Sequence, residues 1–271
     1  IDRRELFDLL FEHIRLNVVL FRGQRFRQGV GIPQGSVLSS LLCSLYYGHM
    51  EEERTNQGLM MRWTDDTIFI TPHREAAVTF AQQHTGVVFG ADKACANFPL
   101  PGFKCHDDGR HFAWCGLLFD AHTLEVSWDY ARYQGTLISD TLTVNGASLL
   151  EKLQQYVRAK CLAVLMSREV NSYDVIWLNV YQMFLYVAMK FHCVCSRSLA
   201  HERKDDDFLF RCICQVAEWA SLLLPGVHPQ CVRYLCMQAF YNMFLYRGVR
   251  LELVPKLAAH LEQNTPAYLR L

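Results

Sequence analysis

Two adjacent carboxylates are the residues whose chemistry most needs an explanation. Asp65 and Asp66 follow an apolar run, residues 59–63, and precede another, residues 68–70. Aspartates at a tight turn can both face one cation, whereas a strand would send neighbouring side chains to opposite faces. Nucleotidyl transfer uses two divalent cations bridged by carboxylates, one at the attacking hydroxyl and one at the triphosphate. The pair therefore indicates a metal site at the tip of a hairpin.

A solvent-exposed turn that binds nothing is the simpler explanation for an Asp-Asp pair taken alone. The flanking residues argue against it, because 59–64 and 68–70 are too apolar for a surface ribbon. Two carboxylates at the tip of a buried hairpin are costly unless cations offset their charge. The flanks therefore favour metal binding.

A second candidate is the segment Gly-Ile-Pro-Gln-Gly-Ser at residues 31–36, about 30 residues earlier. Gly35 allows the backbone to approach a ligand closely, and Ser36 can cap a helix that begins at Val37. The N-terminus of a helix favours anions, here a triphosphate or a template phosphate, and Gln34 supplies an amide. Taken alone, the same residues make an ordinary turn before a capped helix.

The elements that must position these residues change in character near residue 130. In the first half, hydrophobic periodicity predicts helices over 3–17, 37–54 and 74–83. The expected strands of that half cover 18–22, 25–29, 58–63, 67–71, 112–119 and 123–128. In the second half, a loop over 128–145 precedes expected helices over 149–166, 173–194, 208–223, 229–246 and 251–262. The predicted fold class is α+β, with a mixed domain over 1–128 and a helical bundle over 129–271.

Composition restricts the classes of protein that this chain can form. With 271 residues, 51% apolar and 20% charged, it has enough apolar material for two packed domains. The 27 basic and 27 acidic residues give zero formal net charge, so no overall attraction to nucleic acid is expected. From His13 to Met50 there is no carboxylate, and that segment contains Arg15, Arg22, Arg25 and Arg27. A local patch would have to supply any electrostatic attraction.

The eleven cysteines do not suggest a zinc site or a disulfide framework. Their closest pairs are spaced Cys-x-Cys, so we expect reduced, mostly buried thiols in an intracellular protein. The longest uncharged apolar run, residues 175–189, is shorter than the roughly 20 residues that span a bilayer. We therefore expect a soluble protein with no membrane partner.

Together, the two candidate motifs resemble the palm of reverse transcriptases. Longer segments are similar to telomerase reverse transcriptases in particular, and to their vertebrate-like branch. These segments cover residues 28–52, 62–73, 92–99, 114–126, 158–161, 190–193 and 234–240. Group II intron and retron enzymes share the Pro-Gln-Gly turn but lack the Trp-Cys-Gly-Leu-Leu segment that begins at Trp114.

The resemblance implies a partial reverse-transcriptase palm, an antiparallel sheet with helices, over 1–128 and a helical thumb, or C-terminal extension, over 129–271. It implies that Asp65 and Asp66 bind Mg²⁺, two ions in the complete palm, and that Lys93 protonates the leaving pyrophosphate. The residues implied to contact nucleotide or template are Gln34, Gly35, Ser36 and Thr64. The residues implied to form the primer grip are Trp114, Cys115 and Gly116.

The implied activity is RNA-templated synthesis of telomeric DNA repeats at chromosome 3′ ends, in the nucleus and at telomeres. The implied partners are a telomerase RNA, a telomeric DNA primer held as an RNA–DNA hybrid, deoxynucleotides, and accessory telomerase and telomere proteins. The alternative function is a thumb and partial-palm module that binds the hybrid or acts as an interaction module. A reverse transcriptase outside the telomerase branch is a third possibility.

Two departures from the family pattern qualify these expectations. The family carries a third aspartate on an upstream palm strand, and Asp2 and Asp8 lie on or beside a helix and do not fit that role. We therefore expect a C-terminal fragment that is inactive alone. Thumb loops of the family are basic, whereas residues 128–150 contain Arg132 as the one basic residue, which weakens the implied phosphate-clamping surface.

Overall fold

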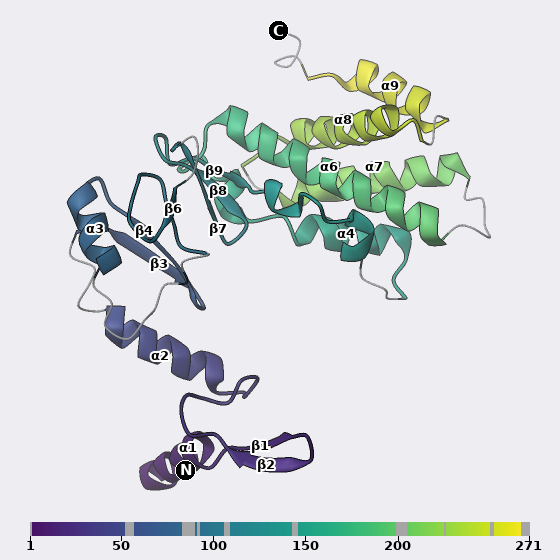
Figure 1. Ribbon diagram of the computed structural model, residues 1–271. Coiled ribbons are helices and arrows are strands. Elements are labelled where there is room, and N and C mark those ends of the chain that lie inside the picture. Colours follow the sequence, from purple (N-terminus) through teal and green to yellow (C-terminus); the bar gives the residue numbers. More distant parts are fainter. Residues whose placement is uncertain are drawn as a thin grey trace. The chain divides into compact units, whose positions relative to one another are not determined.

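The computed structural model describes residues 2–51, 57–82, 90, 93–105, 109–142, 146–198, 205–224, 226–249 and 252–266. Contacts between Cα atoms divide the chain into two compact units, Ile1–Lys93 and Ala94–Leu271. Long helices occur together with small antiparallel sheets (Figure 1). The predicted α+β fold class is confirmed.

The first unit carries its described helices and strands close to where the sequence predicts them. Its helices are α1 (Arg3–Arg15), α2 (Ser39–Glu51) and α3 (Arg74–Gln82). Its antiparallel pairs are β1 (Val18–Phe21) with β2 (Gln24–Arg27), and β3 (Leu59–Trp63) with β4 (Asp66–Ile70). Helix α2 begins two residues later than expected.

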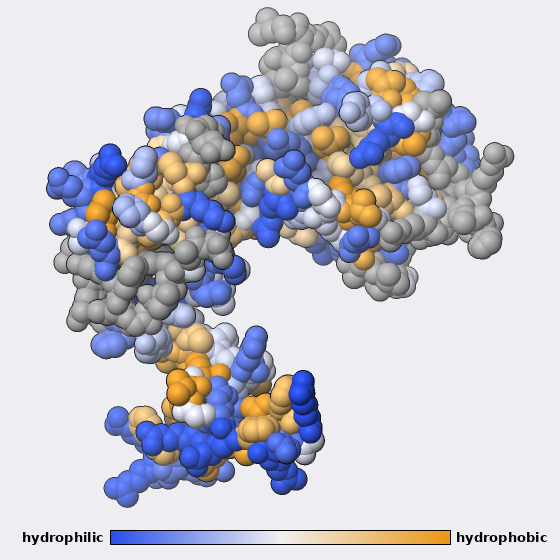
Figure 2. All heavy atoms as spheres, in the orientation of Figure 1, coloured by the Kyte–Doolittle hydropathy of each residue, from blue (hydrophilic) through white to orange (hydrophobic). Residues whose placement is uncertain are grey.

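Much of the apolar surface in the first unit is exposed. Helix α1 buries none of its residues, and all four residues of β1 are exposed. Figure 2 shows apolar side chains on the surface in this part of the chain. The large apolar residues involved include Leu6, Phe7, Leu9, Phe11, Leu20, Phe21 and Phe26.

The second unit combines small sheets with a helical bundle. Strands β7 (His111–Trp114), β8 (Leu117–Asp120) and β9 (Val126–Trp128) form an antiparallel sheet in that order, and β5 (Cys95–Ala96) pairs in parallel with β6 (Lys104–Cys105). Its helices are α4 (Leu149–Arg158), α5 (Ala163–Met166), α6 (Tyr173–Ser198), α7 (Asp206–Leu223), α8 (Pro229–Arg247) and α9 (Leu253–Asn264). Two short 3-10 helices, η1 (Ala131–Tyr133) and η2 (Ile138–Thr141), occupy the expected loop.

Two sequence predictions in this unit are wrong in detail. The strand expected over 112–119 is two strands, because Cys115 and Gly116 form a turn between Trp114 and Leu117. The helix expected over 149–166 is interrupted, because the backbone at Leu162 is extended, with φ −93° and ψ 132°.

The bundle helices carry clear start and stop signals and share one core. Ser148 and Glu151 form a reciprocal capping box at α4, and α8 has Pro229 in its first turn and ends at Gly248, which has φ 60°. Helix α6 packs against α4, α5 and α8, and its Phe191 meets Phe240 and Phe244 of α8 edge to face. These rings are fully buried, so truncating one to Ala would cost about 3–5 kcal/mol.

Two buried asparagines join the three-stranded sheet to the helices. Asn171 Oδ1 accepts a hydrogen bond from Val126 N at 2.7 Å, and Asn179 Nδ2 donates to Val126 O at 3.0 Å. Both amides also donate to Leu165 O, at 3.2 Å and 3.1 Å respectively. If the sheet separated from the helices, the buried N–H and C=O of Val126 would lose these hydrogen bonds. The cost is about 1–3 kcal/mol for each group left unpaired.

The boundary between the compact units therefore lies after Lys93, whereas the sequence predicted a division after residue 128. That prediction followed the change from strand to helix patterns, while the packing joins the sheet to the bundle through Val126. The division into palm and thumb as functional parts, 1–128 and 129–271, stays a prediction.

The cysteines are reduced and form no disulfides, but the prediction that most are buried is only partly right. Cys195, Cys212, Cys231 and Cys236 are buried, whereas Cys105 and Cys115 are exposed. Burial raises the pKa of the Cys236 thiol well above its ordinary value. None of the helices in the described ranges is long and apolar enough to cross a membrane.

We predict that residues 94–271 fold alone and that residues 129–271 are much less stable. The shorter fragment lacks Val126, so Asn171 and Asn179 lose backbone partners in a buried site. We expect its thermal midpoint to be lower by about 10 °C or more. Circular dichroism melts of both fragments test this, and equal midpoints would show that the sheet is not part of the folding unit.

Candidate active site

The Asp-Asp pair lies in and beside a two-residue hairpin turn. The register pairs Trp63 with Asp66, so Thr64 and Asp65 form the turn and Asp66 begins β4. Both aspartates are exposed. The prediction of a hairpin with the aspartates at its tip is confirmed.

Thr64 has an unusual backbone conformation. Its φ is 56°, in the left-handed region that a β-branched residue rarely adopts. Such conformations cost about 1–3 kcal/mol and gather at functional sites, where surrounding contacts hold them in place. Here Arg62 Nη1 donates a hydrogen bond to Thr64 O at 2.9 Å. Sequence reasoning missed this role of Arg62, although a lone arginine within an apolar strand was a signal for it.

The strands that carry the pair are only partly buried. Ile68 is buried, and Phe69 stacks on Phe80 of α3 with 4.3 Å between ring centroids. Trp63, beside the turn, is 71% exposed. The expectation of a buried ribbon is too strong, because β3 and β4 form a sheet of two strands.

The Pro-Gln-Gly-Ser turn precedes α2 and is held closed by Ser36. Ser36 Oγ accepts from Leu38 N at 3.2 Å, and Ser36 O accepts from Ser39 N at 3.1 Å and Ser39 Oγ at 2.7 Å. The expected cap on a helix starting at Val37 is wrong in position, because this turn ends before α2 begins at Ser39. His13 Nε2 of α1 lies 2.6 Å from Ser36 Oγ, which ties α1 to the turn.

Gln34 and Gly35 are exposed within that turn. Gly35 has φ 82°, a conformation that favours glycine, and no heavy atom lies within 4 Å of the place where a Cβ would be. The backbone at Gly35 is therefore open to a ligand.

Lys93 is exposed, in a turn where its backbone N–H donates to Gly90 O at 2.9 Å. It is the last residue of the first unit. Its predicted contact with a leaving pyrophosphate stays a prediction.

In the second unit, Trp114 ends β7, and Cys115 and Gly116 form the turn between β7 and β8. Cys115 and Gly116 both have positive φ, 50° and 82°, as in the tight turns of two-residue hairpins. A Cβ on Gly116 would displace the Arg132 guanidinium, and its φ of 82° would strain any other residue. Asp129 N donates to Gly116 O at 3.0 Å, so the loop after β9 contacts the turn.

An aromatic box around a buried lysine fixes that loop. Lys160 Nζ lies 4.0 Å from the centroid of the Trp128 ring and donates to the Tyr133 hydroxyl at 2.9 Å. Tyr130 and Tyr186 complete the box, with Nζ at 5.6 Å and 5.1 Å from their centroids. Burial raises the pKa of the Tyr130 phenol well above its ordinary value, with Tyr133 and Tyr186 adding to the shift. Sequence reasoning noted Lys160 as part of a motif and missed this role.

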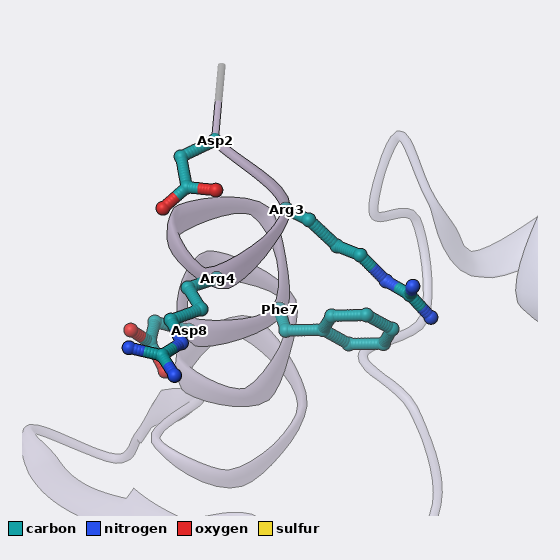
Figure 3. Close-up of a pocket in the computed structure, with 5 residues that line it drawn as sticks. All are labelled: Asp2, Arg3, Arg4, Phe7 and Asp8. Carbon is teal, nitrogen blue, oxygen red and sulfur yellow. The ribbon is translucent and has the colours of Figure 1, made fainter.

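A shallow surface hollow at the first turn of α1 does not form a second site. It is lined by Asp2, Arg3, Arg4, Phe7 and Asp8 (Figure 3). All five residues are exposed, and the four charged ones are two aspartates and two arginines. Asp2 precedes α1 and Asp8 lies within it, as expected, so neither stands on a palm strand.

Asp65 and Asp66 fit Mg²⁺ as part of its ligand set. Mg²⁺ prefers six oxygen ligands in octahedral geometry, and one or two carboxylates with waters and substrate phosphates commonly supply them. Two exposed carboxylates on one turn match that donor chemistry. Within the described part of the chain, no group of three or more His, Cys, Asp or Glu side chains is placed to hold a metal.

Comparisons with known proteins agree with the resemblance. A family model described as the C-terminal extension of telomerase reverse transcriptase matches residues 147–251. The telomerase reverse transcriptase of Rattus norvegicus is 35% identical over 87% of this chain and 24% of its own length. That of Canis lupus familiaris is 32% identical over 96% of this chain and 27% of its own length, and that of Oryza sativa is 36% identical over 70% and 18%. The chain thus spans about a quarter of the length of the first two relatives.

A solved structure supports the same fold. Telomerase from Candida albicans, in complex with a TWJ fragment of telomeric RNA, matches with a TM-score of 0.64 and 13% identity. The match covers 95% of this chain and 40% of the Candida chain.

We predict that this chain alone binds divalent cations weakly, with a dissociation constant above about 1 mM, because two carboxylates leave most of the oxygen ligands to water. Manganese relaxation measurements test this, with the double variant Asp65→Asn, Asp66→Asn as the baseline. Tight stoichiometric binding that the double variant abolishes would mean that a third ligand lies within the chain, and Asp2 and Asp8 would be the first candidates.

Proposed function

The chain belongs to the telomerase reverse transcriptase family, and on that basis we propose that it forms part of a polymerase that copies RNA into telomeric DNA. The observation that carries this proposal is the exposed Asp65–Asp66 turn, which shares a compact unit with the Pro-Gln-Gly-Ser turn. The activity takes place at telomeres, in the nucleus, with a primer 3′ end and deoxynucleotides as substrates.

Asp65 and Asp66 hold the cations and offset their charge. Two Mg²⁺ ions, when bound, supply the positive charge that activates the primer hydroxyl and stabilises the transferring phosphoryl group. The remaining protein ligand is a third carboxylate contributed by other residues of the complete enzyme, as the family resemblance implies. This chain is therefore inactive when isolated.

The turn before α2 positions the incoming nucleotide. Gly35 presents an open backbone, Gln34 presents an exposed amide, and Ser36 keeps the turn closed. We assign Gln34, Gly35 and Thr64 to contacts with the incoming nucleotide and its template partner. Lys93, exposed and cationic, protonates the leaving pyrophosphate.

The second unit holds the primer and its RNA partner. The turn Trp114-Cys115-Gly116 acts as primer grip, supported by its fixed conformation against Arg132 and the loop after β9. The helical bundle acts as the thumb on an RNA–DNA hybrid. A telomerase RNA is the proposed nucleic-acid partner, in line with the telomeric RNA fragment bound by the Candida relative, and accessory telomerase and telomere proteins are proposed partners as well.

A basic face on the β1–β2 hairpin supplies electrostatic attraction that the net charge does not. The register pairs Val18 with Arg27 and Leu20 with Arg25, so these four residues share one face. Both arginines are exposed, and no carboxylate occurs from His13 to Met50. We assign this face to the phosphates of the template or hybrid.

A module that binds the hybrid, or a partner protein, without taking part in catalysis is the alternative function. It is favoured by the fact that no third carboxylate joins Asp65 and Asp66 among the residues that the structure describes. The two functions differ in whether nucleotide addition requires the charge of Asp65.

Within the full-length protein, Asp65→Asn is expected to abolish primer extension while folding and RNA assembly persist. Asn keeps the shape but removes the charge that offsets a cation, a loss of about 10³-fold or more in rate. Gln34→Ala is expected to raise the apparent nucleotide KM with a smaller loss of rate, about tenfold, because Gln34 positions without carrying charge.

Telomeric primer-extension assays with purified ribonucleoprotein measure both effects. Asp174→Asn, at an exposed aspartate in the first turn of α6, is the matched control and is expected to act like wild type. Near wild-type extension by Asp65→Asn would favour the alternative function.

The double variant Arg25→Gln, Arg27→Gln is expected to weaken binding to the RNA–DNA hybrid. The slope of the logarithm of the binding constant against the logarithm of the salt concentration is expected to become shallower by about two, one for each phosphate that an arginine no longer neutralises. Fluorescence anisotropy over a series of salt concentrations measures this. Arg4→Gln, at an exposed arginine of α1, is the control. An unchanged slope would exclude the hairpin from the nucleic-acid interface.

A further inference from the structure

Arg62 of β3 connects α2 to the Asp-Asp turn through its guanidinium. Its Nε lies 2.5 Å from Glu51 Oε1, and its Nη2 donates to Ser44 O at 3.4 Å. The guanidinium carbon lies 5.2 Å from the centroid of the Tyr47 ring. Nη1 donates to Thr64 O at 2.9 Å. One planar group thus contacts the middle and the end of α2 and the residue that immediately precedes Asp65.

The ion pair between Arg62 and Glu51 is partly shielded from solvent. Its side chain is 15% exposed and that of Glu51 is 22% exposed. Ion pairs in such surroundings are screened by salt less than surface pairs, and hydrogen bonds with a charged donor and acceptor are stronger than neutral ones. The Arg62–Glu51 pair is therefore a firm attachment between strand and helix.

The attachment acts at the point where the turn is strained. Thr64 holds a φ of 56°, which needs support from its surroundings, and Arg62 fixes the carbonyl of that same residue. Helix α2 begins three residues after Ser36, and a helix is a rigid element with hydrogen bonds along its length. A side chain attached to α2 is therefore also connected to the Pro-Gln-Gly-Ser turn that precedes this helix, which we call the nucleotide turn.

We propose that Arg62 is a positioning residue that sets where Asp65 and Asp66 stand relative to the nucleotide turn. This inference rests on the proposed function, because the position of the carboxylates matters only if they hold catalytic cations. Arg62 does not touch the substrate in this assignment. It acts through Thr64 on one side and α2 on the other.

The shape of the guanidinium is the property required. Arginine presents several N–H donors in a fixed plane, so it can serve Glu51, Ser44 and Thr64 together. Lysine keeps the charge but presents a single ammonium on a flexible stem. Arg62→Lys therefore separates the positioning role from the charge, and Glu51→Gln weakens the attachment without touching the turn.

The test uses the full-length protein assembled with its RNA. Arg62→Lys is expected to lower kcat and to weaken Mn²⁺ binding by about 10–100-fold, as for other residues that orient ligands without contacting the metal. The KM for the DNA primer is expected to stay unchanged. The amide hydrogens of residues 64–67 are expected to exchange faster, because the turn loses its support. Glu51→Gln is expected to change kcat, Mn²⁺ affinity and amide exchange in the same directions, but by smaller amounts.

Arg74→Lys, at an exposed arginine that begins α3, is the matched control and is expected to leave every readout at wild type. Circular dichroism establishes that the variants fold, and Glu51→Gln decides the outcome if Arg62→Lys does not fold. Wild-type Mn²⁺ binding and exchange in Arg62→Lys, beside an inactive Asp65→Asn, would overturn the positioning role and leave the proposed function intact. An active Asp65→Asn would instead overturn the proposed function itself.

Discussion

The hydrogen bond from Arg62 to the carbonyl of Thr64 is the interaction on which the candidate site depends. Asp65 lies in a two-residue turn with Thr64, and Asp66 begins β4 directly after it. The turn holds Thr64 in a conformation that β-branched residues avoid. The Arg62 guanidinium donates to the carbonyl of the strained residue, and Glu51 attaches that guanidinium to α2. The turn that carries Asp65 is therefore held by a contact to a neighbouring helix.

The second unit uses polar groups in a similar way where its apolar core ends. Asn171 and Asn179 bind both backbone groups of Val126, and the ammonium of Lys160 holds Tyr133 inside an aromatic box. Buried polar groups of this kind are costly unless paired, so each fixes its neighbours in a single arrangement. The loop after β9 places the Arg132 side chain beside Gly116 in the proposed primer-grip turn.

Elements with local sequence signals were predictable from the sequence, and long-range polar interactions were not. Helical periodicity located the bundle, and the polar Asp-Asp pair between apolar runs located its hairpin. The turn at Cys115 was missed although Gly116 is a usual turn residue, because the residues on both sides of the turn are apolar and favour a strand. The packing of the three-stranded sheet onto the helices was not predictable, because Asn171 and Asn179 stand 45 and 53 residues from Val126. The role of Arg62 likewise depends on partners 11 and 18 residues away.

Asp65 and Asp66 are proposed to hold catalytic cations in the complete enzyme. Iron(II) can replace magnesium at such a site, and with ascorbate and peroxide it produces hydroxyl radicals that cut the nearest backbone. In the full-length protein, we expect cleavage within residues 64–67 that excess magnesium suppresses and that Asp65→Asn removes. Cleavage confined to other parts of the protein, with the hairpin intact, would contradict it.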